Sequence, residues 1–162
     1  MKIAMITGSF DPVTTGHLDL IKRTARIFGK VYVAVLINPD KRYVFTTDER
    51  LGLLRLALNG IANAEAVASS GSAVDLAKQY RADCFVRGLR DGEYGYERDM
   101  AAFNYQDGGG IDTVFLPATE SAAKTSSTMV KNLLAEGQSV EAYIPSDAYK
   151  DFLKLCQGKI IR

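Results

Sequence analysis

The sequence predicts a single α/β domain over residues 1–162, built on a doubly wound, Rossmann-like five-stranded parallel sheet with helices on both faces. Short apolar runs alternate with longer segments in which apolar residues recur every three or four positions, the patterns of strands and amphipathic helices. Because the runs are apolar throughout, we expect burial on both faces and helical crossovers between parallel strands. A chain of 162 residues is long enough for one such core.

Five apolar runs predict the strands. The first ends at Gly8 and the second at the pair Asn38-Pro39, and these residue types interrupt a strand. The predicted strands are Lys2–Thr7, Val31–Ile37, Glu65–Ala68, Asp83–Arg87 and Thr113–Leu116. In such sheets ligands bind at the carboxyl ends of the strands. The residues that follow each run are therefore the first candidates for a site.

The segments between the strands carry helical periodicity or helix-start signals. Thr46 stands three residues before Glu49, which is the spacing of a capping box at a helix start. Gly29 follows the first periodic segment and ends it. Helices are predicted over His17–Phe28, from Thr46 through Ile61, from Ser72 through Tyr80, and over Tyr94–Tyr105, Ser127–Ala135 and Asp147–Leu155.

Charge and composition argue against several classes of protein. With 20 basic and 19 acidic residues the net charge is +1, which does not suit a protein that coats nucleic acid. No apolar stretch approaches the roughly 20 residues that span a bilayer, and the first apolar run is too short for a signal peptide. The two cysteines and the single histidine lack metal-type spacing. We expect a cytosolic protein that binds neither membrane nor nucleic acid and has no metal-ligating side chains.

The segment Gly8–His17 joins the first predicted strand to the first predicted helix. Its sequence is Gly-Ser-Phe-Asp-Pro-Val-Thr-Thr-Gly-His. Free N–H groups and the helix dipole make a helix start an anion site, and an imidazole there can donate to a phosphate oxygen. A lone histidine is more often an ordinary surface or core residue, and this reading of His17 stays open from the residues alone. The loop lacks the lysine and the spacing of a Walker A motif.

Basic and hydroxyl side chains follow three other predicted strands. Lys41 follows the second strand, where it is either a phosphate ligand or a solvated charge. Arg87 and Arg90 flank Gly88-Leu89 at the end of the fourth strand, and two guanidinium groups can hold phosphates there. The hydroxyl-rich segment Thr125–Thr128 stands at the start of a predicted helix. Its side chains are either ordinary N-cap residues or hydrogen-bond donors to a triphosphate.

These residues together resemble a known family. Thr14-Thr15-Gly16-His17 resembles the T-x-G-H form of the H-x-G-H motif of nucleotidyltransferases. With Lys41, Phe45-Thr46, Glu49-Arg50, the Arg87–Arg90 block, Tyr96-Glu97, Ser126–Thr128 and Val130-Lys131, the resemblance runs nearly end to end and points to the bacterial phosphopantetheine adenylyltransferases. The chain differs from the usual family pattern at Ala122-Ala123-Lys124, where a Trp-containing sequence is common.

The resemblance implies an activity and a set of site residues. The implied reaction transfers adenylate from ATP to 4′-phosphopantetheine with Mg²⁺, giving dephospho-coenzyme A and pyrophosphate, in an enzyme that is typically a homohexamer. The implied catalytic residue is His17, which would stabilise the transition state. The implied contacts to phosphopantetheine are Ser9, Lys41, Ala73 and Arg87. The implied contacts to ATP are Ser9, Phe10, His17, Gly88, Leu89, Arg90, Glu97, Ala122, Ala123, Lys124, Thr125, Ser126, Ser127 and Thr128.

Two other functions remain open at the level of sequence. One is a related nucleotidyltransferase that acts on another phosphorylated substrate, such as nicotinamide mononucleotide. The other is an ATP-binding module without catalytic activity. For the implied reaction no general base is needed, because a phosphate monoester with a second pKa of about 6 is already a dianion near neutral pH.

Overall fold

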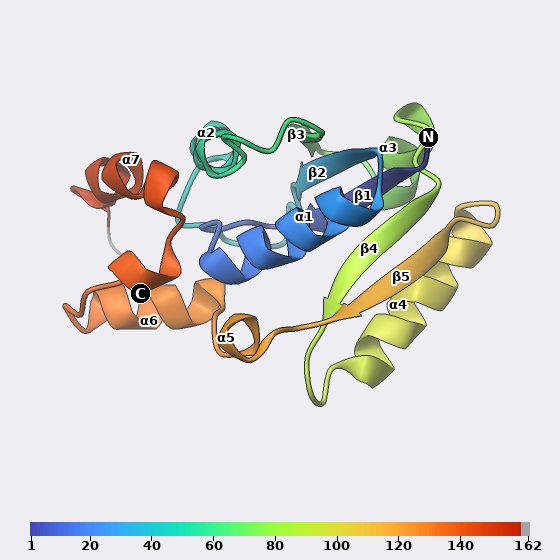
Figure 1. Ribbon diagram of the computed structural model, residues 1–162. Coiled ribbons are helices and arrows are strands. Elements are labelled where there is room, and N and C mark those ends of the chain that lie inside the picture. The colour runs from blue at the N-terminus through green and yellow to red at the C-terminus, as the bar shows by residue number, and fades with distance from the viewer. Residues whose placement is uncertain (160–162) are drawn as a thin grey trace.

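The computed structural model describes residues 1–159, and the last three residues of the predicted domain, 160–162, lie outside the described residues. Five parallel strands form one sheet in the order β3-β2-β1-β4-β5 (Figure 1). The strands are β1 Ile3–Gly8, β2 Lys30–Leu36, β3 Ala64–Ser69, β4 Cys84–Leu89 and β5 Asp112–Pro117. The strand order reverses between β1 and β4, and this switch point is where open α/β sheets bind ligands.

Helices cover both faces of the sheet, as predicted. They are α1 Thr15–Ile27, α2 Thr47–Ala57, α3 Ala73–Gln79, α4 Tyr94–Asp107, α5 Glu120–Ala123, α6 Ser127–Ala135 and α7 Ser146–Cys156, with a 3₁₀ turn, η1, at Glu141–Tyr143. Side chains of α1, α2, α6 and α7 join one core cluster, and side chains of α3 join a second cluster. In Figure 1, α4 lies along β5 at the far edge of the sheet from α2.

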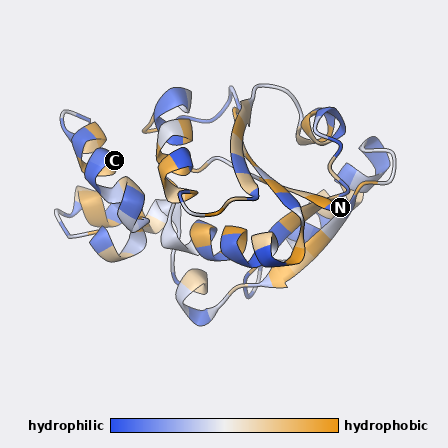
Figure 2. Ribbon diagram, turned by 45° about the horizontal axis from the view of Figure 1, so that its top comes forward, coloured by the Kyte–Doolittle hydropathy of each residue, from blue (hydrophilic) through white to orange (hydrophobic). Residues whose placement is uncertain are grey.

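The alternation of side chains along β1 separates the two cores. Ala4 and Ile6 belong to the larger cluster, whereas Met5 belongs to the smaller one, and all three are buried. This is the two-sided burial that an uninterrupted apolar run indicates. Figure 2 shows that the helices are amphipathic, with hydrophobic residues on one side and hydrophilic residues on the other. In the part of the chain described, no helix is both long and apolar enough to cross a bilayer.

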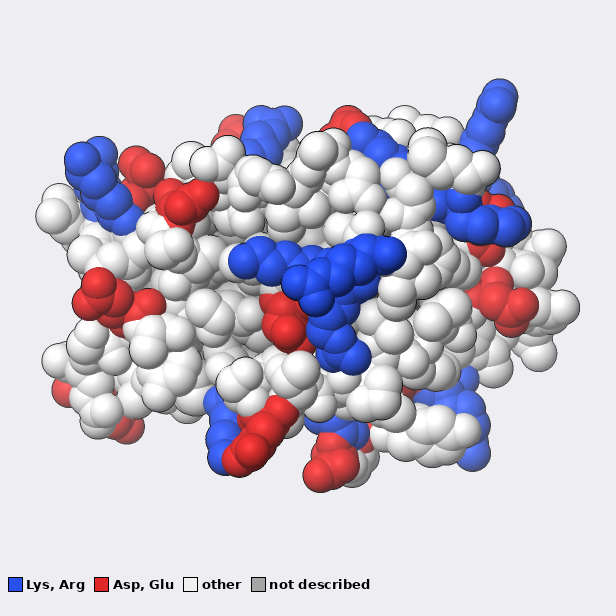
Figure 3. Space-filling model, in the orientation of Figure 1, with Lys and Arg blue, Asp and Glu red and all other residues white. Residues whose placement is uncertain are grey.

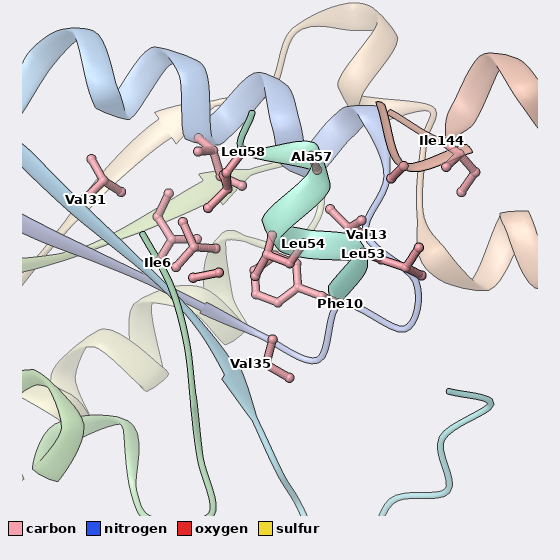
Figure 4. Close-up of a cluster of buried hydrophobic side chains, with 14 of the residues drawn as sticks. Ile6, Phe10, Val13, Val31, Val35, Leu53, Leu54, Ala57, Leu58 and Ile144 are labelled. Atoms are coloured by element: carbon pink, nitrogen blue, oxygen red, sulfur yellow. The ribbon is translucent and has the colours of Figure 1, made fainter. Parts of the chain in front are cut away.

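The loop after β1 is anchored in the larger core. Phe10 is buried and points into the cluster beside Ile6 and Leu54 (Figure 4). Its backbone has a φ of 47°, an uncommon value for a residue with a side chain. Burial of a complete aromatic ring stabilises that turn, so the loop is part of the hydrophobic core as well as of the switch point.

Several predicted boundaries were wrong by one to four residues. Gly8 lies in β1, and β4 extends two residues beyond its predicted end at Arg87, so Gly88 and Leu89 are strand residues and do not lie in the loop that follows. The helix predicted through Ile61 ends at Ala57, and α5 and η1 were not predicted. Burial on both faces fails for β5, whose Val114 is 38% exposed, because β5 is an edge strand.

The C-terminal helix α7 should contribute strongly to stability. Phe152 on α7 is completely buried, and its ring centroid lies 5.8 Å from that of Phe45. Phe152→Ala should lower the free energy of unfolding by about 3–5 kcal/mol, because it removes buried surface and leaves a cavity. The neighbouring Leu153 is 42% exposed, and Leu153→Ala should cost less than about 1 kcal/mol. Urea unfolding of both variants measures the difference, and equal losses would contradict the packing described.

Candidate active site

Two cavities meet where β1 and β4 end. The first encloses about 250 Å³ and is lined by residues of β1, α1, β4 and α5. The second encloses about 350 Å³ and is lined by residues of β1, the β2–α2 loop, α3 and α4. Thr7, Gly8, Arg87 and Glu97 line both cavities. The switch point is therefore the wall between two neighbouring cavities, each open to a different side of the sheet edge.

His17 is held at the start of α1 by a reciprocal cap. The Thr14 side chain accepts the backbone N–H of His17, and Nδ1 of His17 accepts the backbone N–H of Thr14 at 3.0 Å. An Nδ1 that accepts a hydrogen bond carries no proton, so the proton of the neutral ring lies on Nε2. The T-x-G-H sequence thus fixes the tautomer of the imidazole, and His17 lines the first cavity with a donor to offer.

The surroundings of His17 keep it neutral. Burial, and then the positive charges of Arg90 and Arg87, lower the pKa of His17 from 6.5 to about 4. The ring of Phe10 lies edge-on to the imidazole at a centroid distance of 4.9 Å and restricts its orientation. At neutral pH the imidazole is therefore a positioned hydrogen-bond donor without charge.

Gly16 allows α1 to approach the segment that follows β5. A Cβ at this position would lie 3.2 Å from the carbonyl oxygen of Thr125 and 3.3 Å from that of Ala122. These contacts are with backbone atoms, which cannot move aside as a side chain can. The glycine of the motif is therefore needed for packing, and it brings the helix that carries His17 against the α5–α6 turn.

A partly buried ion pair lies between the two cavities. Arg87 donates from Nε and Nη2 to the two oxygens of Glu97 at 2.9 and 2.8 Å, and from Nη1 to the carbonyl oxygen of Thr7 at 2.9 Å. The Glu97 side chain is only 7% exposed. The hydrogen bonds that Arg87 donates to the Glu97 carboxylate raise the pKa of Arg87. The guanidinium therefore stays charged in the wall between the cavities, and it keeps N–H groups that these bonds do not use.

Arg90 connects the first cavity to the start of α6. It lines that cavity, and its Nη2 donates to the carbonyl oxygen of Thr125 at 2.9 Å. Ser126 caps α6, and the Ser127 hydroxyl donates to the carbonyl oxygen of Pro12 at 2.7 Å. The β4–α4 loop, the β1–α1 loop and the start of α6 are thereby joined by hydrogen bonds beside one cavity, which the Arg90 guanidinium lines.

Lys41 belongs to the second cavity. Its Nζ donates to the Ser9 hydroxyl at 3.2 Å, and its carbon chain is otherwise exposed. Ala73, the first residue of α3, lies in the same lining with Ser9 and Arg87. The four residues predicted to contact phosphopantetheine therefore line one cavity.

The residues predicted to contact ATP are brought together only in part. Phe10, His17, Gly88, Arg90, Glu97 and Ala122 line the first cavity. The remaining members do not line it: Ser9, Leu89, Ala123, Lys124, Thr125, Ser126, Ser127 and Thr128. Lys124 instead donates to Glu120 at 2.7 Å on the exposed side of α5. Contact between these residues and ATP stays a prediction.

Two residues of α1 that line the first cavity were not predicted from the sequence as site residues. Asp19 and Arg23 line the outer part of the first cavity, and Arg23 donates to the carbonyl oxygen of Pro117 at 2.7 Å. Their spacing of four residues on a predicted helix was the available signal, because it places the two side chains on the same side of α1. Figure 3 shows basic side chains gathered over α1 near the middle of this face, with acidic side chains beside them.

The protonation of His17 can be measured directly, because it is the only histidine in the chain. Nitrogen-detected NMR should show one imidazole with its proton on Nε2 and a pKa near 4. The pKa of His17 in the folded protein lies below its value of 6.5 in the unfolded chain, so the unfolded chain takes up a proton at higher pH. The contribution of His17 to the free energy of unfolding is therefore lost as the pH falls from about 6.5 to about 4. A pKa above 6, or a proton on Nδ1, would contradict the geometry described.

Comparison with known proteins identifies the family. A family model described as cytidylyltransferase-like matches residues 5–133. The phosphopantetheine adenylyltransferase of Symbiobacterium thermophilum is 45% identical over 143 residues, which cover 88% of each chain. The enzyme of that name from Limosilactobacillus reuteri strain DSM 20016 is 39% identical over 91% of this chain and 86% of its own. That from Clostridium novyi is 36% identical over 94% of this chain and 96% of its own.

A solved structure has the same fold at lower sequence identity. A Vibrio parahaemolyticus protein described as a candidate nicotinate-nucleotide adenylyltransferase superposes with a TM-score of 0.70 at 20% identity, covering 95% of this chain and 93% of that one. At this identity the likeness concerns the fold alone. The family model and the relatives carry the assignment: this chain belongs to the cytidylyltransferase-like family and, within it, to the phosphopantetheine adenylyltransferases.

Proposed function

We propose that this protein transfers adenylate from ATP to 4′-phosphopantetheine, giving dephospho-coenzyme A and pyrophosphate in coenzyme A biosynthesis. The observation that carries the proposal is the pair of cavities that share Arg87 and the end of β1, with His17 in one and Lys41 in the other. A transfer between two phosphorylated substrates requires two neighbouring anion sites. The relatives named above support this choice of substrates.

The arrangement suits a direct in-line transfer. The phosphate of phosphopantetheine, held by Lys41 and Arg87, would attack the α-phosphorus of ATP, and the P–O bond to pyrophosphate would break. The nucleophile is already an anion near neutral pH, so no base has to remove a proton. The protein's task is to hold two anions that repel each other and to stabilise charge in the transition state.

His17 and Arg90 would act on the ATP side. The neutral imidazole, with its proton on Nε2, would donate to an oxygen of the α-phosphate as charge develops there. Arg90 and the N-terminus of α6 would hold the leaving pyrophosphate. The imidazole is half-buried in the lining of the first cavity, where a bound substrate would displace water from it.

Magnesium is part of the proposal as a partner of ATP. Among residues 1–159 no three His, Cys, Asp or Glu side chains gather as a metal site. Three carboxylates line the first cavity: Glu97 is paired with Arg87, Asp19 lies 3.5 Å from Arg23, and Glu93 is exposed at the start of α4. They do not gather as a set of metal ligands. Mg²⁺ therefore fits as an ion held by phosphate oxygens and water, where it would offset the negative charge of the phosphates.

Assembly and location are proposed on narrower grounds. The homo-oligomer, a hexamer by family resemblance, is supported by exposed apolar side chains on α4 and β5, among which Tyr96 is 67%, Phe103 60% and Val114 38% exposed. Exposed apolar patches of this kind are typical of interaction surfaces. Size-exclusion chromatography with light scattering would measure the assembly. A cytosolic location remains the expectation from sequence.

The substrate can be tested by pyrophosphate release. Protein mixed with ATP, Mg²⁺ and 4′-phosphopantetheine should release pyrophosphate and form dephospho-coenzyme A in equal amounts. With nicotinamide mononucleotide in place of phosphopantetheine the rate should be lower by at least about a hundredfold, because the second cavity would not hold that substrate in line. A preference for the mononucleotide would replace the proposed substrate, and ATP binding without turnover would support a non-catalytic module.

The role of His17 can be tested by substitution. His17→Ala should lower kcat by about a hundredfold to a thousandfold, the usual effect of removing one donor to a developing charge. His17→Gln keeps an amide N–H near the position of Nε2, so its kcat should fall less than that of His17→Ala. Circular dichroism and thermal unfolding would check the fold of both variants. Undiminished turnover by a folded His17→Ala protein would exclude this catalytic role.

A further inference from the structure

The position of Lys41 depends on the loop that carries it. Lys41 lies in the segment between β2 and α2, residues 37–46, which we call the lysine loop. A lysine side chain has four flexible carbons and only a point charge at its end. The ammonium group of Lys41 makes one hydrogen bond, to the Ser9 hydroxyl, and lies 6.0 Å from the centroid of the Tyr43 ring. The shape of the lysine loop must therefore determine where the ammonium group lies over the second cavity.

Tyr43 holds the middle of the lysine loop. Its hydroxyl accepts the backbone N–H of Asn38 at 2.9 Å and so closes a turn around Lys41. A second bond within this turn runs from the Lys41 N–H to the carbonyl oxygen of Asn38 at 3.1 Å. The ring of Tyr43 covers the guanidinium of Arg50, whose central carbon lies 3.9 Å from the ring centroid. One side chain thus joins the turn to a group outside the loop.

Arg50 is a fixed support for that ring. The residue is 1% exposed, and its Nη1 donates to the carbonyl oxygen of Ser9 at 2.7 Å. A second bond runs from Nη2 to the Thr47 hydroxyl at 3.2 Å, whereas the buried Nε has no hydrogen-bond partner. A charge buried this deeply is costly unless it is compensated, and the face of an aromatic ring attracts a guanidinium. The Tyr43 ring therefore stabilises Arg50 and is itself held in place.

Asp11 holds the end of the lysine loop. Its buried carboxylate accepts the N–H of Phe45 at 2.9 Å and that of Val44 at 3.0 Å. Both Asp11 and the Ser9 carbonyl belong to the β1–α1 loop that leads to His17. The lysine loop is thus attached to the same loop that positions the other half of the site, through Asp11 at one point and through Tyr43 and Arg50 at another.

We infer that Tyr43 is a positioning residue, which by stacking on Arg50 and accepting from Asn38 holds Lys41 where it binds the phosphate of the acceptor substrate. The inference rests on the proposed function for the identity of that substrate. It predicts a selective effect, because Tyr43 and Lys41 both line the second cavity and neither lines the first. Loss of Tyr43 should weaken the use of phosphopantetheine and leave the use of ATP nearly unchanged.

Two substitutions separate the hydroxyl of Tyr43 from its ring. Tyr43→Phe removes only the acceptor for the Asn38 N–H and should raise KM for phosphopantetheine about threefold. Tyr43→Leu also removes the ring, which stacks on Arg50 and lies 6.0 Å from the Lys41 ammonium, and should raise this KM about tenfold or more. In both variants KM for ATP should stay within about twofold. Steady-state pyrophosphate release, with each substrate varied in turn, measures these constants.

The matched control is Tyr80→Leu. Tyr80 is also half-buried and also packs its ring on a neighbour, with its centroid 4.4 Å from that of Tyr32, but it lines neither cavity. This variant should leave both KM values unchanged. Amide hydrogen exchange over residues 38–45 provides a readout that does not need turnover. Exchange in the lysine loop should be faster in Tyr43→Leu than in the wild type and unchanged in Tyr80→Leu.

The possible results separate this inference from the proposed function. An unchanged KM for phosphopantetheine in Tyr43→Leu, an equal rise in both KM values, or unaltered exchange in the lysine loop would each overturn the role of Tyr43. Wild-type protein that released no pyrophosphate with phosphopantetheine would overturn the proposed function and the substrate named here. The exchange comparison would then still decide whether Tyr43 holds the lysine loop.

Discussion

Nδ1 of His17 accepts the backbone N–H of Thr14, and the Thr14 hydroxyl accepts the N–H of His17 in return. This cap ends the β1–α1 loop and begins α1, so it fixes where the helix starts and which ring nitrogen carries the proton. A histidine at the third helical position takes the place that a glutamate or glutamine occupies in the usual capping box. The same two bonds that stabilise the helix start leave Nε2 as a donor toward the first cavity.

The charges around this cap explain why the histidine is neutral. Arg87 and Arg90 lie near it and disfavour a second proton on the ring. These guanidinium groups would otherwise repel each other across a small space, but each is held by acceptors: Arg87 by Glu97 and the Thr7 carbonyl, Arg90 by the Thr125 carbonyl. The result is a site with fixed positive charges and one neutral donor, an arrangement suited to substrates that bring the negative charge.

The loops of the site are bound to one another more than to the sheet. Asp11 accepts from the lysine loop, Ser127 donates to Pro12, and Gly16 permits backbone contact with the α5–α6 turn. Phe10 anchors this group of loops in the larger core. Both cavities therefore depend on the conformation of the β1–α1 loop.

The sequence alone determined the fold class, the five strands and the position of His17 at a strand-to-helix corner. These follow from local signals: continuous apolar runs, helical spacing, and a motif whose residues all lie within ten positions. It also placed Lys41 and Arg87 at the ends of strands that converge. The predictions of strand ends and of edge-strand burial were less accurate. Hydrogen bonding to β5 extends β4 to Leu89, and the position of β5 at the edge of the sheet leaves Val114 exposed.

Only the tertiary structure decided which partners these residues have. In the fold both oxygens of Glu97 accept from Arg87, ten positions away, a pairing that the sequence did not predict. The stack of Tyr43 on Arg50 and the two N–H groups that Asp11 accepts have no local signal that distinguishes these residues from solvated side chains. Local patterns report the backbone period and burial, but the pairing of polar side chains depends on distances that exist only after the strands and helices have packed.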